Sequence, residues 1–348
     1  AASDVYKRQY AISLQKKCDR MDKIIGMGNA LTDILALMDD DVLLDELEFP
    51  KGSMQLIDDE KLETVRERFA LMQKHRSAGG SAANTACALA NLGGEVGYLG
   101  KIGKDETGIF YQQALQKNGV DTHLLTSDLP SGFSSILISP DGERTFATYL
   151  GASGTLKSTD LSREHFKGYT YLYIEGYLLQ DHELVIRAMQ LAKEMGLQIC
   201  LDMASYNIVE AERDFFDLLI TRYVDIVFAN ESEAFAYTGK ETHEALDEIA
   251  SKCSIAVVKT GKKGSLIKKG TERIQVEPLA VKKVVDTTGA GDYYAAGFMY
   301  GLMCGYSLEK CAQISSILAG HVIQVVGTTL SPQRWDEIKL NIDAILHA

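Results

Sequence analysis

The stretch VVDTTGAGDYYAAGF, residues 284–298, brings together β-branched residues, a glycine-rich turn and an apolar run of small residues with helical character. Small residues allow the backbone to approach a ligand closely. A helix that begins at the Gly-Ala-Gly turn directs its free N–H groups at that ligand. The stretch therefore predicts an anion-binding site at the start of a helix.

A carboxylate, Asp292, directly follows that turn. Because a carboxylate and a bound anion repel each other, Asp292 is not expected to bind the anion itself. It is better placed to take a proton from a hydroxyl that attacks a phosphoryl group held by the backbone amides. We interpret Asp292 as a general base beside an oxyanion cradle. The alternative is an acidic first-turn residue that only stabilises the helix dipole.

The composition excludes several classes of protein. The 348 residues are 46% hydrophobic, which is enough to bury a substantial core. The formal net charge of -12 argues against a general binder of nucleic acids or anionic membranes. No apolar run approaches the roughly 18 residues that a membrane span requires. Six cysteines without a C-x-x-C pair are typical of reduced thiols in a cytosolic protein and give no metal–cysteine site: Cys18, Cys87, Cys200, Cys253, Cys304 and Cys311.

The first 20 residues, AASDVYKRQYAISLQKKCDR, lack the hydrophobic core of a secretory signal. Met21 precedes a strand-like segment and has the position of a natural start. We expect residues 1–20 to be a tail left by expression or sequence assembly, with a short disordered extension as the alternative. The fold is then expected to occupy residues 21–348.

After Met21, apolar strand-like runs alternate with amphipathic helical segments. The expected strands lie at 23–28, 95–103, 171–176, 198–203, 225–230, 255–260 and near 264. The expected helices lie at 82–92, 110–119, 181–196 and 246–253. Short β-branched runs between helices of about a dozen residues predict βαβ units. The sequence therefore predicts an α/β fold with a mainly parallel sheet in one principal domain.

Two segments, at about 33–57 and 131–150, alternate in the manner of strands without proper crossover helices. The second contains the turn signal PDG at 140–142, which predicts a hairpin. Such segments are expected to form a small separate sheet above the main one. It is either a lid over an active site or an ordinary extra edge hairpin.

Residues 78–103, AGGSAANTACALANLGGEVGYLGKIG, form a second glycine-rich constellation. Gly79 and Gly80 open a helix, and Asn84 lies one turn inside it. The Asn84 amide offers a donor and an acceptor to a polyol. The alternative is that these glycines only let a helix pack tightly on a strand.

The segment ANESE places Asn230 and Glu233 in N-x-x-E spacing directly after an apolar strand. Ligands of open α/β sheets bind beyond the carboxyl ends of the strands. This pair is therefore a candidate for holding Mg²⁺ and its waters. The alternative is a solvated helix start.

The segment IIGMGNALTD resembles a dinucleotide fingerprint at Gly26 and Gly28, but Leu31 stands where a third glycine is required. Asn29 and Asp33 are instead two polar side chains near a strand end, and they suit the binding of hydroxyls. The segment TGKKGS, residues 260–265, does not fit a Walker loop either.

Taken together, these motifs resemble the ribokinase-like, or PfkB, carbohydrate and nucleoside kinases over essentially the whole chain from Met21. Residues 79–103 resemble the N-terminal signature of that family and 286–299 its C-terminal signature, with N-x-x-E between them. The resemblance implies a three-layer α/β/α fold with a mainly parallel sheet and a small β lid. It also implies ATP and Mg²⁺ as cofactors and a small sugar or nucleoside as the partner molecule. One departure is Tyr293-Tyr294, where the family more often has a small residue and then Phe, and these side chains are expected to face the helix packing.

The resemblance also implies a role for each matching residue. It makes Asp292 the catalytic base and forms the anion hole from Gly289, Ala290 and Gly291. It assigns contacts with sugar hydroxyls to Asn29, Asp33, Gly79, Gly80 and Asn84. It places an arginine that reaches phosphates at Arg144, and the nucleotide site at Thr260, Gly261 and Gly264. It assigns the Mg²⁺/phosphate site to Asn230 and Glu233, and allows K⁺ near Asp286 and Thr288.

Within the family, GMGNALTDI and AGGSAANT are most similar to the adenosine kinase branch. Gln55 and Ile57 then match purine-pocket positions, and Tyr177 and Tyr206 offer aromatic faces to a base. A nucleoside acceptor is therefore expected, with a free-sugar kinase as the runner-up. The remaining alternatives are a catalytically silent paralogue, which the intact Asp292 disfavours, and an NAD-dependent enzyme, which Leu31 disfavours. A lid sheet either pairs with that of a partner or stands alone, so both a homodimer and a monomer fit the sequence.

Overall fold

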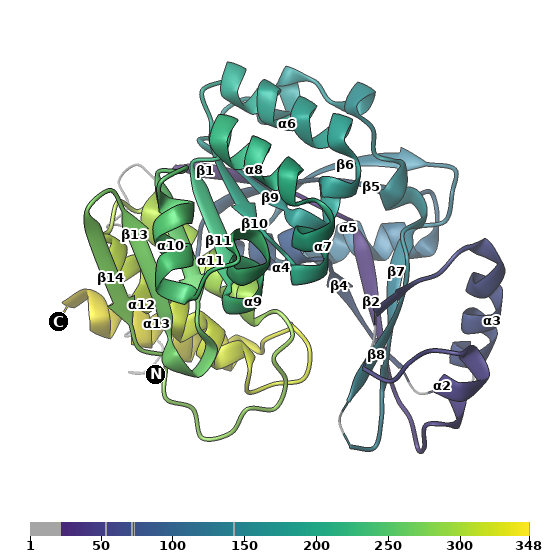
Figure 1. Ribbon diagram of the computed structural model, residues 1–348. Coiled ribbons are helices and arrows are strands. Elements are labelled where there is room, and N and C mark those ends of the chain that lie inside the picture. The colour runs from purple at the N-terminus through teal and green to yellow at the C-terminus, as the bar shows by residue number, and fades with distance from the viewer. Residues whose placement is uncertain (1–21, 53, 71, 73, 142, 348) are drawn as a thin grey trace, which may run out of the picture.

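A computed structural model describes residues 22–347 except 53, 71, 73 and 142 (Figure 1). The expected tail of residues 1–20 lies outside the described residues. Within them, nine strands form one sheet in the order β14-β13-β12-β11-β10-β9-β1-β5-β6. All neighbours from β12 to β6 pair in parallel, while β13 and β14 are antiparallel. The strands are β1 (Lys23–Met27), β5 (Glu95–Gly103), β6 (Asp121–Ser127), β9 (Tyr171–Glu175), β10 (Gln198–Asp202), β11 (Ile226–Asn230), β12 (Ile255–Lys259), β13 (Ser265–Lys269) and β14 (Glu272–Val276).

Helices cover both faces of this sheet, so the fold has the predicted three layers. Side chains alternate along each strand, so Ile24 packs into one core and Ile25 into the other. One core is shared with α4 (Ser81–Asn91), α5 (Glu106–Lys117), α11 (Ala290–Met303), α12 (Leu308–Val322) and α13 (Pro332–His347). The other is shared with α6 (His182–Glu194), α7 (Tyr206–Ala211), α8 (Arg213–Arg222), α9 (Glu231–Thr238) and α10 (Thr242–Ala250). Short 3-10 turns are η1 (Gly151–Thr155), η2 (Ser158–Asp160), η3 (Arg163–Phe166), η4 (Gly176–Gln180) and η5 (Gly261–Lys263).

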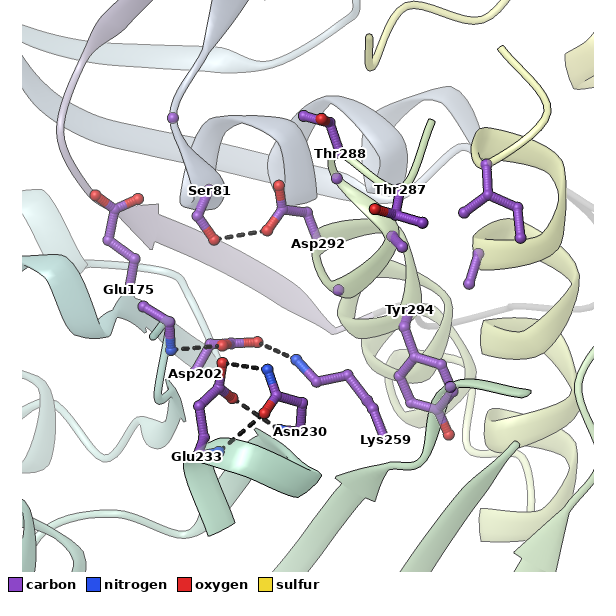
Figure 2. Close-up of a pocket in the computed structure, with 18 of the residues that line it drawn as sticks. Ser81, Glu175, Asp202, Asn230, Glu233, Lys259, Thr287, Thr288, Asp292 and Tyr294 are labelled. Atoms are coloured by element: carbon purple, nitrogen blue, oxygen red, sulfur yellow. Dashed lines mark hydrogen bonds and ion pairs between the residues drawn. The ribbon is translucent and has the colours of Figure 1, made fainter. Parts of the chain in front are cut away.

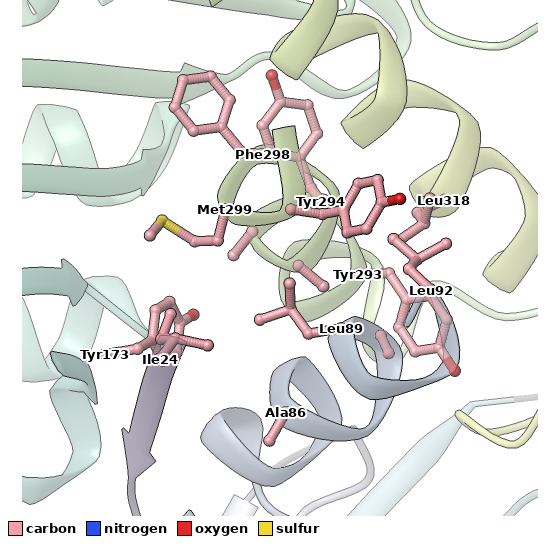
Figure 3. Close-up of a cluster of buried hydrophobic side chains, with 14 of the residues drawn as sticks. Ile24, Ala86, Leu89, Leu92, Tyr173, Tyr293, Tyr294, Phe298, Met299 and Leu318 are labelled. Carbon is pink, nitrogen blue, oxygen red and sulfur yellow. The ribbon is translucent and has the colours of Figure 1, made fainter. Parts of the chain in front are cut away.

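Helix α11, which begins inside the VVDTTGAGDYYAAGF segment, lies between α4 and α12 (Figure 3). A Cβ atom on Gly297 would lie 2.6 Å from the Cα of Ser315, so glycine is what lets α11 and α12 pack this closely. Tyr293 and Tyr294 are both buried, as expected. The Tyr293 hydroxyl donates to the carbonyl oxygen of Thr328, and that of Tyr294 to Ser265 Oγ. Among the described residues, no helix is long and apolar enough to cross a membrane.

A second sheet of five described strands stands to one side of the main one, in the order β3-β8-β7-β2-β4 (Figure 1). Its strands are β2 (Leu31–Leu37), β3 (Met54–Leu56), β4 (Lys74–Gly79), β7 (Gly132–Ile138) and β8 (Arg144–Tyr149). The predicted hairpin is confirmed, because β7 and β8 pair antiparallel around the PDG turn, whose Gly142 lies outside the described residues. Strand β4 was not predicted. The strand-like segment 33–57 also contains a short helix, α2 (Val42–Leu47), and α3 (Asp59–Ala70) follows it.

Helices α2 and α3 cover one face of this small sheet. Ala36 and Leu137 from the strands pack there with Leu44 of α2 and Phe69 of α3. Successive residues of a strand point to opposite faces of the sheet. Asp33 and Thr148 therefore lie on the other face, which is turned toward the main sheet. The small sheet thus has one face for its own core and one face for a cavity.

Candidate active site

A cavity of about 1110 Å³ lies between the small sheet and the carboxyl ends of the main strands. Its floor is built from residues that end or follow parallel strands: Asn29, Glu175, Asp202, Asn230 and Lys259. The small sheet contributes Asp33, Ser134, Phe146 and Thr148. The turn into α11 contributes Gly289, Ala290, Gly291 and Asp292. This is where open α/β sheets bind ligands, because loops there converge from many strands.

Asp292 lies in the first turn of α11 and its carboxylate is held by α4 (Figure 2). Ser81 Oγ donates to Oδ1 at 2.7 Å, and Asn84 Nδ2 donates to Oδ2 at 2.9 Å. Burial raises the pKa of Asp292 to about 6, and these two hydrogen bonds oppose the rise. The result is a fixed carboxylate that is ionised at neutral pH and has a higher proton affinity than an exposed aspartate.

The turn before Asp292 has the geometry of an anion cradle. Gly289 has a φ of 73°, and a Cβ atom there would lie 2.5 Å from Thr328 Cγ2, so glycine is required on both counts. The first i→i−4 hydrogen bond of the helix runs from Tyr293 N–H to the carbonyl of Gly289. The N–H groups of Gly291 and Asp292 have no backbone acceptor among the described residues. Free N–H groups at a helix start favour an anion.

Asn29, Asp33 and Gly80, which the sequence assigns to hydroxyl binding, line the cavity together. Gly80 has a φ of 89°, and a Cβ atom there would lie 2.4 Å from the carbonyl oxygen of Asn29. A Cβ atom on Gly79 would lie 2.3 Å from the carboxyl group of Asp33. The two glycines therefore bring the start of α4 against these polar groups. Burial, and secondarily the charge of Asp292, raise the pKa of Asp33 to about 7.

Asn84 has a different place from the one predicted. Its amide nitrogen donates to Asp292, and its amide oxygen accepts from Thr328 Oγ1 at 3.1 Å. Asn84 does not line the cavity within the described part of the chain. Asn84 therefore orients the Asp292 carboxylate from behind the cavity wall.

Glu175, at the end of β9, is a buried carboxylate that the motifs did not indicate. It accepts hydrogen bonds from the backbone N–H groups of Asn29 and Ala82, each at 2.8 Å. Burial raises its pKa to about 7, against the effect of these hydrogen bonds. A Cβ atom on Gly28 would lie 2.4 Å from its Oε2 atom, so a glycine is needed beside it. Glu175 thus ties the loop after β1 to the start of α4.

Asn230 and Glu233 form a reciprocal capping box at the start of α9. Asn230 Oδ1 accepts from the N–H of Glu233 at 2.9 Å, and Glu233 Oε2 accepts from the N–H of Asn230 at 2.7 Å. Asn230 Nδ2 also donates to Glu233 Oε1 at 2.6 Å. Both residues line the cavity, so the N-x-x-E pair combines a structural cap with a place at the site.

Asp202 and Lys259 face each other on the same floor and were not predicted. Lys259 Nζ donates to Asp202 Oδ2 at 3.0 Å, and both side chains are largely buried (Figure 2). Asp202 Oδ1 also accepts from the N–H of Ala204 at 2.9 Å. The pKa of Lys259 is raised, with Asp202 as the main charge that outweighs the cost of burial. Asp202 and Lys259 each stand at the end of an apolar strand. A charged residue in that position was the feature of the sequence that could have indicated a place in the site.

Arg144 of β8 reaches the loop that leads into α11. Its Nη2 lies 2.6 Å from Asp286 Oδ2, and its Nη1 donates to Thr288 Oγ1 at 2.6 Å. The carboxylate of Asp286 also accepts from the N–H groups of Thr288 and Gly327. The two side chains assigned to K⁺ are therefore bonded to a guanidinium group, and a cation there would have to use backbone carbonyl oxygens or compete with Arg144.

The other end of the cavity is lined mainly by apolar residues. Gly261 and Gly264 line it, whereas Thr260 is buried behind them and donates its N–H to the carbonyl of Gly264. The wall continues through Pro278, Leu279, Ala280, Val281, Val284, Ala319, Gly320 and Ile323. Cavities of this kind suit an aromatic base with few polar anchors.

Three of the four residues proposed for a purine pocket do not line the described cavity. Among the described residues, Leu56 rather than Gln55 lines the cavity, because successive residues of β3 point to opposite faces. Ile57 packs into the core under α2 and α3. Tyr177 lines the cavity and its hydroxyl lies 3.4 Å from the carbonyl oxygen of Ala204. Tyr206 is half-exposed and does not line the described cavity.

Comparisons with known proteins show the family of the chain. The model of the pfkB family carbohydrate kinases matches residues 53–335. A structure of an adenosine kinase from Sinorhizobium meliloti is 34% identical, with a TM-score of 0.82, and the match covers 94% of this chain and 100% of that one. A structure of a probable sugar kinase from Rhizobium etli CFN 42 is also 34% identical, with a TM-score of 0.83, covering 92% and 98% of the two chains.

Adenosine kinase 2 of Arabidopsis thaliana is 28% identical over 338 residues, which are 90% of this chain and 96% of the relative. A ribokinase of the same plant is 28% identical over 298 residues, which are 81% of this chain and 76% of the relative. The relatives thus include both nucleoside and sugar kinases. The chain belongs to the pfkB family of carbohydrate kinases, enzymes that phosphorylate hydroxyl groups of sugars and nucleosides.

Proposed function

We propose that this enzyme transfers the γ-phosphoryl group of ATP to a primary hydroxyl of a nucleoside similar to adenosine, with Asp292 as the general base. The observation that carries this proposal is the position of Asp292. It lies between the anion cradle of α11 on one side and the hydroxyl-binding candidates Asn29 and Asp33 on the other. A cavity with two ends joined at a fixed carboxylate suits two substrates that react at that point.

A nucleoside rather than a free sugar is supported by the apolar side chains near Asp33. Leu31, Leu56, Phe146 and Leu150 line the cavity on the side of the small sheet. Leu56 is 54% exposed although it lies in a cavity wall, and such apolar surface is typically covered by a ligand. A ribose offers only hydroxyls and a small ring, whereas a purine base offers a flat apolar face.

The proposed reaction is an in-line displacement. The acceptor hydroxyl oxygen forms a bond to the γ-phosphorus, the bond to the ADP oxygen breaks, and the hydroxyl proton passes to Asp292. The N–H groups of Gly291 and Asp292 would stabilise charge that develops on the transferred group. The small sheet would act as a lid, because it covers the acceptor side and is linked through Arg144 to the loop before α11. Such a lid keeps water away from ATP.

Glu233 fits a magnesium site that forms together with ATP. Among the described residues, no cluster of three or more His, Cys, Asp or Glu side chains would hold a metal alone. Mg²⁺ is usually held by one or two carboxylates, substrate phosphates and waters. Two of the four or so acceptor sites of the Glu233 carboxylate are used by Asn230, which leaves sites for metal-bound water. When bound, Mg²⁺ would neutralise phosphate charge.

The test is release of ADP from Mg²⁺-ATP with adenosine, inosine, guanosine, ribose and fructose, each with KCl and with choline chloride. Turnover on a nucleoside and not on ribose is the expected result. Turnover on a free sugar alone would contradict the nucleoside assignment while leaving the kinase reaction. Comparison of turnover in KCl and in choline chloride tests the predicted K⁺ requirement.

A variant pair sharpens the acceptor test. Leu56→Ser should raise the KM for the nucleoside about tenfold, since burying an apolar side chain contributes about 1.5–3 kcal/mol. Leu37→Ser is the control, because Leu37 is an exposed leucine of the same sheet that does not line the described cavity. Equal KM values for the two variants would remove Leu56 from the acceptor site.

A further inference from the structure

We propose that the ammonium group of Lys259 binds the phosphoryl group while it is transferred, and that Asp202 is the positioning residue that holds Lys259 there. This inference rests on the proposed phosphoryl transfer from ATP. It adds a cationic side chain to the backbone amides, the carboxylates and Arg144 that the sequence motifs and their resemblance assign to the site. Neither residue belongs to those motifs.

The fold brings Lys259 to the cradle from the opposite side of the cavity. Lys259 is the last residue of β12 and is the register partner of Asn230 in β11. Its Nζ atom would lie only 3.2 Å from a Cβ atom on Gly291. The ammonium group thus lies against the first turn of α11. An anion that accepts a hydrogen bond from the N–H of Gly291 would be within reach of Nζ as well.

The hydrogen bonding of Lys259 leaves donors for such an anion. An ammonium group has three N–H donors. Within the described part of the chain, Asp202 is the hydrogen-bond acceptor found for Lys259, at 3.0 Å. Asp202 is itself fixed by the N–H of Ala204, so the pair has a defined position. One bond holds the lysine, and the remaining donors are available at the cavity.

The charges around the cavity show why a cation is needed there. Asp202, Glu233 and Asp292 all act on Lys259 at close range. Three carboxylates would repel the phosphates of ATP unless positive charge offsets them. Among the described residues that line the cavity, the cationic side chains are Lys259 and Lys262. Lys259 is largely buried, whereas Lys262 is exposed. A bound metal would share this task, but Lys259 is fixed beside the cradle.

The competing explanation is a purely structural ion pair. Buried ion pairs contribute little net stability and are often replaced by apolar residues without loss. A structural pair would affect the unfolding temperature and would not distinguish ATP from ADP. A phosphoryl ligand would do the opposite, because only ATP and its analogues carry the group that is transferred.

The experiment uses four variants of the full chain. Lys259→Met removes the charge, and Lys259→Arg restores it. Asp202→Asn combined with Lys259→Met avoids leaving a buried carboxylate unpaired, so it guards against simple unfolding. Lys263→Met is the control, because Lys263 is 80% exposed and lies outside the described cavity. Each is measured for kcat, for the KM of the acceptor, and for the affinity of AMP-PNP and ADP by calorimetry.

Lys259→Met is expected to lower kcat about a hundredfold, as loss of one oxyanion donor does, with the KM of the acceptor within twofold of the wild type. AMP-PNP binding should weaken about tenfold while ADP binding stays within twofold. The double variant should keep these defects with a normal unfolding temperature, Lys259→Arg should recover at least a tenth of the wild-type kcat, and Lys263→Met should match the wild type.

The inference is overturned if the folded double variant keeps kcat within threefold of the wild type, or if its preference for AMP-PNP over ADP is unchanged. Failure of the proposed function has a different signature. If only a free sugar is phosphorylated, the same ratios are measured on that sugar. If no acceptor is phosphorylated at all, the affinity ratio of the two nucleotides still decides whether Lys259 contacts the terminal phosphoryl group.

Discussion

Arg144 Nη2 lies 2.6 Å from Asp286 Oδ2, and this contact joins the small sheet to the loop that leads into α11. The arginine side chain is 14% exposed and the carboxylate 4%, so the pair is shielded from water. The same guanidinium group also donates a hydrogen bond to Thr288 Oγ1, so two bonds hold Arg144 to this loop. The contact couples the position of the proposed lid to the geometry of the anion cradle.

Arg144→Met should therefore loosen the small sheet. A charge-assisted hydrogen bond contributes about 1.5–3 kcal/mol, so the closed arrangement should be favoured at least tenfold less. We expect faster amide hydrogen exchange in β7 and β8 and a KM for ATP raised about tenfold. Lys51→Met is the matched control, because it breaks the exposed ion pairs of Lys51 with Asp41 and with Asp141 in the turn between β7 and β8. Unchanged exchange in Arg144→Met would show that the contact does not hold the sheet.

Asp292→Asn should fold normally and lose about a thousandfold in kcat, because general bases typically contribute 10²–10⁴. The asparagine keeps the shape of the side chain but takes no proton. Glu309→Gln is the control, since Glu309 is an exposed acidic residue in the first turn of α12. If Asp292 served only the helix dipole, both variants would lose a few tenths of a kcal/mol of stability and neither would lose turnover.

Turnover should fall on the acidic side with a midpoint near pH 6. The pKa of Asp292 is raised to about 6 by burial, and its ionised form is the one that accepts a proton. Activity is then retained above that pH and falls about tenfold per pH unit below it. Ser81→Ala removes a hydrogen bond to the ionised carboxylate, so the midpoint should move upward. A midpoint that stays in place in this variant would exclude Asp292 as the titrating group.

The sequence predicted the interior of the main sheet well, because the signal there is local. Strands β1, β9 and β10 are buried on both faces and appear as short apolar runs with sharp ends. The two outermost strands of the same sheet, β6 (DTHLLTS) and β14 (ERIQV), were not predicted. An edge strand is half exposed, so polar residues interrupt its apolar pattern. Strand β4, at the edge of the small sheet, was not predicted for the same reason.

The site shows the same division between local and long-range signals. Asp292 and its glycine turn lie in one stretch of sequence, so their place at the start of one helix could be predicted from neighbouring residues. Lys259 and Asp202 are 57 residues apart and meet only because β10 and β12 end at the same edge of the sheet. Asn84 was expected to touch substrate, but a fold that brings α4 against α11 turns it to Asp292 instead. Contacts between distant segments were therefore the part that the sequence did not predict.

The role of Glu175 depends on hydrogen bonds between segments that are distant in the sequence, and it can be tested by substitution. Its two carboxylate oxygens accept hydrogen bonds from the backbone N–H groups of Asn29 and Ala82. In a glutamine, the amide NH₂ group would replace one of these oxygens and would face a backbone N–H that needs an acceptor. Glu175→Gln should lose about 1–3 kcal/mol of unfolding free energy, the cost of an unsatisfied buried group. The loop with Asn29 should also shift, raising the KM of the acceptor more than that of ATP.

The pH dependence of that loss has a definite sign. The pKa of Glu175 is raised from its ordinary 4.5 to about 7, so the folded state binds its proton more tightly than the unfolded state. Its contribution to stability therefore falls as pH rises from about 4.5 to 7. Glu175→Gln removes this dependence, so the stability difference from the wild type should be largest near pH 4.5 and smaller at pH 8. Chemical denaturation at both values, with exposed Glu183→Gln as control, measures it, and a difference that grows with pH would contradict the raised pKa.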